Sequence, residues 1–242
     1  MNVIMIKVGF IGAGDISLLH AEGVKSSQNS QLTGIWNRTR EKAEEKSKLF
    51  NCKVFDSVED LIQAVDVVYI LTNMETHHQY ARLAIDAGKH VLIEKPTATT
   101  IEEIQDLEQT ARTNGVQVAP VHNYIYEPSV TRAKELIESG KIGDLVSLYI
   151  LYNIHHPEEV ASRYPGVIRQ ILTHHAYCSL YLAGAPEKIS CMKATVNDGS
   201  VPQENIAMVN MKMKNNSLSH LCASFAADDH AGDPWTFMIK LI

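Results

Sequence analysis

The segment His90–Thr97, which reads HVLIEKPT, places two opposite charges directly after an apolar run. The run has the character of a buried strand, and Glu94, Lys95 and Pro96 follow it. A lysine at the end of a buried strand is partly desolvated, so its pKa falls and its ammonium group can hydrogen-bond a reacting oxygen. A surface lysine that extends from a strand end into solvent is the alternative. The segment therefore indicates Lys95 as a candidate catalytic residue.

A glycine turn lies near the N-terminus, in Val8–His20 (VGFIGAGDISLLH). Gly12 and Gly14 follow an apolar strand and precede a helix, the setting in which backbone N–H groups reach a pyrophosphate. Ser17 takes the place of the third glycine and is small enough for close packing of helix on strand. A tight turn without a ligand is the alternative, but the strand–helix–strand context favours dinucleotide binding.

The end of the second strand bears on which dinucleotide is bound. A carboxylate there would bind the ribose 2′-hydroxyl of NAD, but the residues after Trp36 are Asn37, Arg38, Thr39 and Arg40. Arg38 and Arg40 can hold a 2′-phosphate by charge-assisted hydrogen bonds, or they simply begin a polar helix. The pattern favours NADP and leaves NAD open.

The elements that position these residues alternate between strand and helix in the first half of the chain. Near-continuous apolar strands separated by helices predict an α/β Rossmann domain, a doubly wound parallel sheet with helices on both faces. The predicted strands are Ile4–Ile11, Gln31–Trp36, Val65–Leu71, His90–Ile93 and Val116–Val121; the predicted helices are Asp15–Ser26, Thr39–Phe50, Ser57–Gln63, Glu75–Ala87 and Thr100–Thr113. Gly88 and Gly115 stand where left-handed C-caps are expected.

The second half of the chain has a different pattern of strands and helices. A helix from Pro128 to Ser139 is followed by strand-like segments with one apolar helix among them, which predicts an α+β domain with a mostly antiparallel open sheet. The helix is Val167–Leu182, and the strands are Leu145–Asn153, Lys188–Val196, Asn205–Lys214, Ser217–Phe225 and Trp235–Ile242. The predicted domains are residues 1–122, which bind the dinucleotide, and 123–242, which bind substrate and a second subunit.

Composition excludes several classes of function. The chain has 242 residues, is 45% hydrophobic and carries a formal net charge of −6, which gives no basic footprint for nucleic acid or an anionic membrane. The four cysteines form no CxxC pair, so we expect a reducing, cytoplasmic location. The N-terminal apolar run leads into the glycine turn and reads as a strand, not a signal peptide, and no apolar run approaches membrane-spanning length.

Asp66–Thr97, together with GFIGAG, resembles the Gfo/Idh/MocA family of NAD(P)-dependent oxidoreductases (glucose-fructose oxidoreductase and inositol dehydrogenase-like proteins). Members show a TPxxxH-like motif after one strand and an AGKHVxxEKP motif around the next. The matching residues are Thr72, His77, Ala87–Val91, Glu94–Pro96, His122–Tyr124, Pro128 and Glu138–Gly143, with Asn73 in place of the usual proline. The resemblance covers essentially the whole chain, although family members are usually longer, so we expect a chain that is short at its C-terminal end.

The resemblance implies a cofactor site at the carboxyl ends of the parallel strands, where ligands of such sheets bind. It also suggests a cis bond between Lys95 and Pro96. The expected cofactor-binding residues are Gly12, Gly14, Asp15, Ile16, Asn37, Arg38, Arg40, Thr72, Asn73, His77, Glu94, Lys95 and Asn123.

The second domain of the family carries an Asp-x-x-x-His helix, whose spacing of four directs both side chains to one face. Here the histidine position is His174 and the aspartate position is Gln170. Histidine is a suitable acid/base near neutral pH, whereas glutamine orients a substrate but does not ionise. His175 substitutes for His174 if the register slips by one residue. Ile125 stands where the family often has an arginine.

We therefore expect an NAD(P)-dependent dehydrogenase or reductase that acts on a sugar, polyol or related small carbonyl or hydroxyl compound. The resemblance implies hydride transfer at nicotinamide C4, with Lys95, His174 and Gln170 as the catalytic set. Tyr126, Gln170, His174 and His175 are the expected substrate-binding residues. No histidine pair accompanies a carboxylate in metal-ligand form, so no metal site is expected. The alternative is a family member that binds the dinucleotide as a sensor and catalyses nothing.

A second subunit is the remaining expected partner. In Asn205–Lys214, apolar side chains alternate onto both faces, with Ile206 and Met208 on one side and Ala207 and Val209 on the other. One face can pack on the helices and the other on a second copy of the chain. We expect a homo-oligomer, a dimer or a tetramer.

Overall fold

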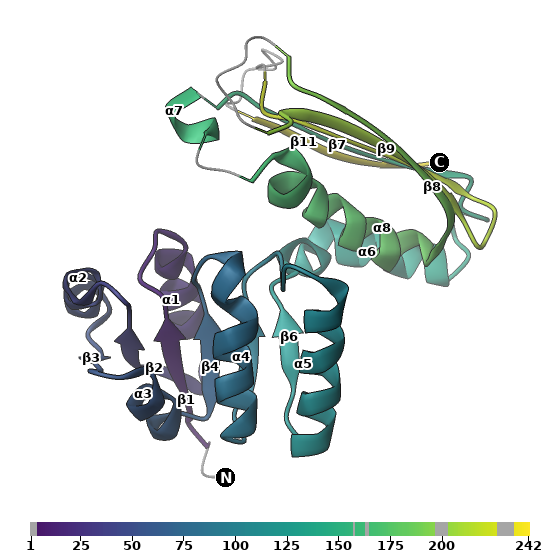
Figure 1. The fold of residues 1–242 in the computed structure, drawn as a ribbon. Helices are drawn as coiled ribbons and strands as arrows, with labels where there is room; N and C mark the ends of the chain where they lie inside the picture. The colour runs from purple at the N-terminus through teal and green to yellow at the C-terminus, as the bar shows by residue number, and fades with distance from the viewer. Residues whose placement is uncertain (1–3, 157, 163–164, 197–202, 227–234) are drawn as a thin grey trace. The chain divides into compact units, whose positions relative to one another are not determined.

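The computed structural model describes residues 4–156, 158–162, 165–196, 203–226 and 235–242. The chain divides into two compact units, one ending at Val121 and the other beginning at His122 (Figure 1). Each unit has its own sheet and its own hydrophobic core.

The first unit is built on a six-stranded sheet in which every described pairing is parallel. Its spatial order, β3-β2-β1-β4-β5-β6, reverses direction beside β1 and so brings the carboxyl ends of β1 and β4 together. The strands are β1 (Ile6–Ile11), β2 (Ser30–Trp36), β3 (Lys53–Val54), β4 (Val67–Ile70), β5 (His90–Ile93) and β6 (Val118–Pro120).

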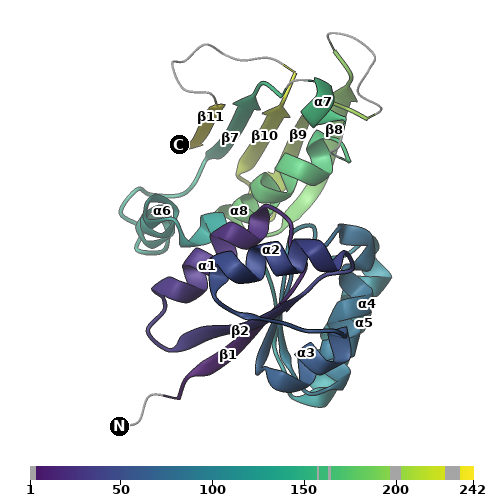
Figure 2. The same cartoon turned by 90° about the vertical axis from the view of Figure 1, so that its left-hand side faces the viewer.

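Five α-helices cover this sheet. Figure 2 shows α1 and α2 on one face, while α3, α4 and α5 cover the other. They are α1 (Ile16–Ser26), α2 (Arg40–Phe50), α3 (Val58–Ala64), α4 (His77–Asp86) and α5 (Ile101–Asn114), with a 3₁₀ turn, η1 (Met74–Thr76), before α4. Each face has an apolar core: Phe10 and Ile35 lie on the α1 side, whereas Ile70 and Ile93 lie on the other. This is the doubly wound α/β architecture predicted from the strand–helix alternation.

Local signals in the sequence explain several helix ends. The Thr100 hydroxyl accepts the N–H of Glu103 at 3.2 Å and caps α5, and Ser57 caps α3 in the same way. Gly115 ends α5 in the left-handed conformation with φ of +67°. Gly88 has φ of +72° just after α4, so both predicted glycine caps are confirmed.

The second unit is built on a five-stranded sheet of order β11-β7-β10-β9-β8. Every neighbouring pair is antiparallel except β7 and β10, which run parallel, so the predicted mostly antiparallel sheet is confirmed. The strands are β7 (Ser147–Ile154), β8 (Pro186–Ala194), β9 (Ile206–Met213), β10 (Leu218–Ser224) and β11 (Trp235–Leu241).

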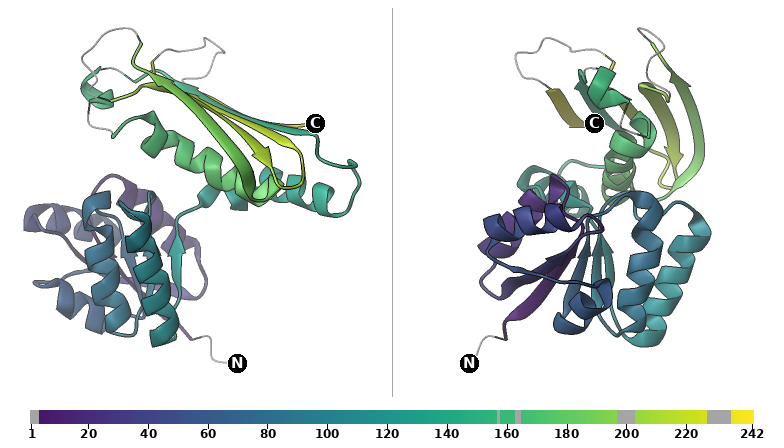
Figure 3. Two further views of the ribbon diagram at one scale, coloured as in Figure 1. Left: turned by 45° about the vertical axis from the view of Figure 1, so that its right-hand side comes forward. Right: turned by 60° about the vertical axis from the view of Figure 1, so that its left-hand side comes forward.

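Figure 3 shows α6 and α8 packed on one face of this sheet. The helical elements are a 3₁₀ turn η2 (Asn123–Tyr126), α6 (Pro128–Glu138), α7 (Glu158–Ala161), a π-helical turn η3 (Ile168–Leu172) and α8 (Thr173–Ala183). The core between helices and sheet includes Leu148, Cys178 and Met213. All helices in the described part of the chain fall short of the length and apolarity that crossing a bilayer requires.

Candidate functional site

The glycine turn after β1 is closed on one side and open on the other. Gly12 has φ of +116°, and a Cβ atom there would lie 2.6 Å from the carbonyl oxygen of Leu71. A Cβ on Gly14 would meet nothing within 4 Å. The Ser17 hydroxyl donates to the carbonyl of Gly14 at 2.6 Å and is fully buried, so Ser17 anchors the turn to α1. The N-terminus of α1 thus faces open space, as binding of a diphosphate requires.

Asn37 connects this turn to the end of β2. Its Oδ1 accepts the N–H of Ala13 at 3.1 Å, and its Nδ2 donates to the carbonyl of Thr39 at 2.8 Å. The side chain of Asn37 therefore fixes the two loops that border the opening. It adds no charge at the position where NAD-binding proteins place a carboxylate.

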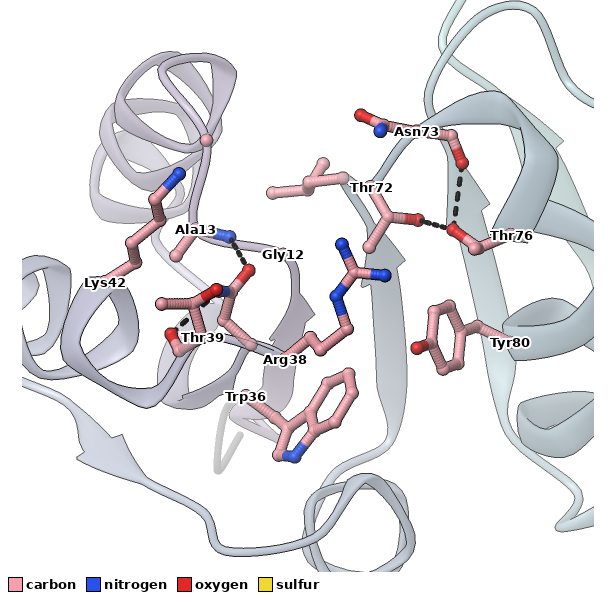
Figure 4. A pocket seen from close by; sticks show the side chains of 13 residues that line it. Gly12, Ala13, Trp36, Arg38, Thr39, Lys42, Thr72, Asn73, Thr76 and Tyr80 are labelled. Carbon is pink, nitrogen blue, oxygen red and sulfur yellow. Dashed lines mark hydrogen bonds between the residues drawn. The ribbon is translucent and has the colours of Figure 1, made fainter.

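A crevice opens between these loops and the end of β4 (Figure 4). Two cationic side chains, those of Arg38 and Lys42, line it, and the rings of Trp36 and Tyr80 meet edge to face there at 5.6 Å between centroids. The lining residues are Gly12, Ala13, Gly14, Trp36, Asn37, Arg38, Thr39, Lys42, Leu71, Thr72, Asn73, Thr76 and Tyr80.

Arg40 does not line this crevice. Its Nε donates to Glu44 at 2.7 Å and its Nη1 pairs with Asp56, which holds the guanidinium group on the exposed side of α2. Lys42 lines the crevice instead. Sequence reasoning missed it, although its position four residues after Arg38 was a usable signal.

Two polar contacts order the end of β4. The Thr76 hydroxyl lies 2.8 Å from Thr72 Oγ1 and 2.9 Å from the carbonyl of Asn73 (Figure 4). His77 is buried, and its ring nitrogens lie 2.9 Å from the carbonyl oxygens of Thr72 and Pro96. His77 therefore ties the end of β4 to the segment after β5, and its contacts are with backbone.

Lys95 follows β5 and is half-buried, and its bond to Pro96 is cis. Burial lowers the pKa of Lys95, while the neighbouring Glu94 carboxylate acts in the opposite sense. Glu94 is itself buried. Its Oε2 accepts the backbone N–H of Lys95 at 3.0 Å, and its Oε1 lies 2.8 Å from Nε2 of His20. Sequence reasoning placed Glu94 at this site but missed His20.

The second unit contains a cluster around Tyr177 of α8. Nδ1 of His174 lies 2.7 Å from the Tyr177 hydroxyl, which also lies 3.2 Å from Oδ1 of Asn123. The same hydroxyl accepts the N–H of Tyr124 at 3.2 Å, and the ring of His122 stacks on Tyr177 at 4.2 Å. The unit thus brings His174 and Asn123 together through a tyrosine that sequence reasoning missed.

The other predicted site residues of this unit differ from one another in burial. Gln170 lies in the π-helical turn, half-buried, with its N–H bonded to the carbonyl of Gly166 at 3.1 Å. His175 is fully buried in the core, beside Tyr152 and Phe237. Tyr126 is 79% exposed.

A buried carboxylate fixes the start of the π-helical turn. Oε1 of Glu204 accepts the N–H of Ile168 at 3.3 Å, and Oε2 lies 3.2 Å from Nζ of Lys193. Gly166 has φ of +94°, and a Cβ there would clash with Glu204. The glycine and the glutamate together set where the helix that carries Gln170 begins. Among the described residues, no three His, Cys, Asp or Glu side chains gather as metal ligands.

Two family models match this chain. The model described as "Oxidoreductase family, NAD-binding Rossmann fold" matches residues 6–122, and that of the "GFO/IDH/MocA C-terminal domain" matches residues 130–239. Together they cover both units and most of the sequence.

Several similar proteins are named as dehydrogenases. Glucose-6-phosphate 3-dehydrogenase of Bacillus subtilis (strain 168) is 33% identical over 146 residues, which is 60% of this chain and 42% of that protein. UDP-N-acetylglucosamine 3-dehydrogenase of Acidithiobacillus ferrooxidans is 29% identical over 92% of this chain and 68% of that protein. The scyllo-inositol 2-dehydrogenase (NADP(+)) IolW of Bacillus subtilis is 27% identical over 76% and 54%. For many of these relatives the match spans about half of their length.

Solved structures share the fold at low sequence identity. The apo scyllo-inositol dehydrogenase from Lactobacillus casei gives a TM-score of 0.90 at 20% identity, over 100% of this chain and 74% of that one. GenD2 from gentamicin A biosynthesis, solved in complex with NAD, gives 0.89 at 19% identity over 100% and 71%.

Proposed function

Because the chain belongs to the Gfo/Idh/MocA family of oxidoreductases, we propose that it is an NADP-dependent dehydrogenase or reductase of a sugar or polyol. The relatives named above act on a sugar phosphate, a nucleotide sugar and an inositol. The proposed reaction interconverts a secondary hydroxyl of such a compound and the corresponding ketone.

The crevice of the first unit fits a dinucleotide. Its glycine turn offers the N-terminus of α1 to the diphosphate, and Arg38 and Lys42 offer two cations where a 2′-phosphate would lie. Asn37 is neutral and stands at the position where a carboxylate would repel that phosphate. The two cations and the neutral Asn37 favour NADP over NAD. When bound, the nicotinamide supplies the acceptor or donor of a hydride at C4.

The observation that carries the proposal is the environment of Lys95. Lys95 is half-buried, burial lowers its pKa, and it follows the buried Glu94 at the carboxyl end of a strand in the sheet that forms the crevice. Ligands of open parallel sheets bind at such strand ends. There Lys95 hydrogen-bonds the reacting oxygen and stabilises the negative charge that develops on it during hydride transfer.

We assign the proton transfer to His174. His174 takes the hydroxyl proton in the oxidation and returns it in the reduction, and Tyr177 orients its ring through Nδ1. Gln170 holds a substrate hydroxyl by hydrogen bonds, and Tyr126 and Asn123 contribute to the substrate and cofactor contacts.

Titration of the protein with NADPH and NADH, followed by turnover on a panel of sugars, sugar phosphates and cyclitols, tests the proposal. Lys95→Ala should lower kcat by about 100-fold or more while NADPH affinity is kept, because general acid–base groups contribute that much. Turnover that Lys95→Ala leaves unchanged would refute the assignment. NADPH binding without turnover of any compound, unaltered by Gln170→Asp, would favour a dinucleotide sensor instead.

A further inference from the structure

His20 is a histidine for which the proposed reaction has no role, yet its ring is held firmly in the first unit. It lies on α1, and its ring meets Phe10 of β1 and Tyr69 of β4 nearly edge-on, at 79° and 78°. Phe10 and Tyr69 stack on each other at 5.4 Å. The ring of His20 therefore packs against this pair of aromatic rings, with its Nε2 directed towards the end of β5.

The partner of His20 is the carboxylate next to Lys95. Nε2 lies 2.8 Å from Oε1 of Glu94, and the two side chains are only 12% and 11% exposed. A carboxylate oxygen accepts, so Nε2–H is the donor. Oε2 of Glu94 accepts the backbone N–H of Lys95 at 3.0 Å. The two oxygens thus point at His20 and at the main chain.

A buried carboxylate that loses one hydrogen bond seeks another donor, because an unsatisfied buried charge is costly. The Lys95 ammonium group is a candidate donor, because the charge of Glu94 already raises the pKa of Lys95 against the effect of burial. Without His20, Oε1 would turn to that group. A lysine held by a carboxylate is a poorer donor to a substrate oxygen, and its ammonium form is stabilised.

We propose that His20 is a positioning residue that occupies the Glu94 carboxylate and so keeps it from pairing with the Lys95 side chain. The link also joins α1, whose N-terminus faces the crevice, to the strand end that carries the lysine. This inference rests on the proposed function, in which Lys95 meets the reacting oxygen. In the described part of the chain, the titratable groups that contact the link are Tyr69 from β4 and Glu94 and Lys95 after β5.

The test compares three variants. His20→Phe keeps a ring on Phe10 and Tyr69 but removes the donor, His20→Gln keeps an N–H donor without the ring, and His20→Phe/Glu94→Gln removes donor and charge together. The pH dependence of Lys95 acetylation, followed by mass spectrometry, reports the pKa of Lys95 without requiring turnover. Thermal unfolding reports folding, and kcat is measured apart from the KM for NADPH.

We expect His20→Phe to raise the acetylation midpoint of Lys95 by about one pH unit and to lower kcat about tenfold, with an unchanged KM for NADPH. His20→Gln should restore both values to near wild type, and the double variant should bring the midpoint back to or below wild type. His78→Phe is the matched control, because Nε2 of His78 lies 2.7 Å from a carboxylate oxygen of Asp106, which lies on α5 and not beside Lys95.

An acetylation midpoint in folded His20→Phe that equals or falls below wild type would overturn the proposal. An equal loss of kcat in folded His20→Gln and His20→Phe would also overturn the proposal, since it would show that activity depends on the imidazole ring and not on the hydrogen-bond donor. If Lys95→Ala keeps full turnover, the proposed function fails, while the acetylation midpoints still decide the role of His20.

Discussion

Nδ1 of His174 lies 2.7 Å from the hydroxyl oxygen of Tyr177, one helical turn further along α8. The hydroxyl accepts the Tyr124 N–H and donates to either Asn123 or His174. Its single proton therefore selects which ring nitrogen of His174 is protonated. A carboxylate usually orients a histidine base in this way; here the partner of His174 is a tyrosine hydroxyl, and Gln170, in the turn before α8, stands at the expected aspartate position.

Tyr177→Phe should therefore lower kcat about tenfold, because His174 loses the hydrogen bond that fixes its ring and tautomer. The affinity for NADPH should change much less than kcat, because most of the proposed cofactor contacts belong to the crevice of the first unit. Steady-state kinetics with the best substrate of the panel measures both quantities. A kcat within twofold of wild type would show that the Tyr177 hydroxyl does not orient the base. His155→Gln, at an exposed histidine of the same unit, is the control.

The cations of the crevice give a prediction about cofactor choice. Arg38→Ala and Lys42→Ala should each weaken NADPH binding about tenfold or more and leave NADH binding within twofold, since a hydrogen bond to a charged group contributes about 1.5–3 kcal/mol. Fluorescence titration with both cofactors measures this.

Arg40→Ala is the matched control for these variants, because Glu44 and Asp56 hold Arg40 outside the lining of the crevice. It should affect neither cofactor. Equal losses of NADPH and NADH in the Arg38 and Lys42 variants would contradict a 2′-phosphate site.

The sequence predicted the fold because periodicity and turn residues are local signals. β5 was placed with its observed bounds, and most other elements within one to three residues. β3 was missed because two residues, Lys53 and Val54, give no periodicity, and α7 because four residues do not either. The parallel pairing of β7 with β10 depends on contacts across about 70 residues, which no local pattern encodes.

The site was predicted to the extent that motifs mark it. The glycines and the EKP segment mark the crevice and Lys95 as candidates, whereas the contacts of His20 with Glu94 and of Tyr177 with His174 form only after folding. Arg40 was expected at the cofactor site, but the first turn of α2 directs Lys42 to the crevice and Arg40 to Asp56.

The outer face of the second sheet bears on the expected homo-oligomer. Ile189 of β8 is 62% exposed, Leu218 of β10 is 59% exposed and Tyr149 of β7 is 39% exposed; they line one shallow depression on the sheet. A second copy of the chain would cover such an apolar surface. Ile189→Lys/Leu218→Lys should lower the mass observed by light scattering to that of a monomer. A wild-type protein that is already monomeric at micromolar concentration would contradict the expectation.

The buried His175 gives a prediction about stability and pH. Among the described residues, neither of its ring nitrogens has a hydrogen-bond partner. Burial lowers the pKa of His175 from 6.5 to about 3. The unfolded chain binds a proton at this residue near pH 6.5, whereas the folded protein does not until the pH is far lower. Its effect on the free energy of unfolding is therefore nil above pH 6.5, and stability falls as the pH drops below that value.

The slope from His175 alone is about 1.4 kcal/mol per pH unit, or about 2 kcal/mol between pH 6.5 and pH 5. His175→Leu removes the titrating group and two unsatisfied polar atoms. The free energy of unfolding of the variant should therefore fall by about 2 kcal/mol less than that of the wild type between pH 6.5 and pH 5, and the variant should be the more stable protein at acidic pH. Urea unfolding at pH 7.5, 6 and 5 measures the difference from wild type. Burial also lowers the pKa of His122 and His156, but both are present in each protein, so the difference isolates His175. If the free energy of unfolding depends on pH equally in the two proteins, His175 binds its proton as readily in the folded state as in the unfolded state, and burial does not lower its pKa.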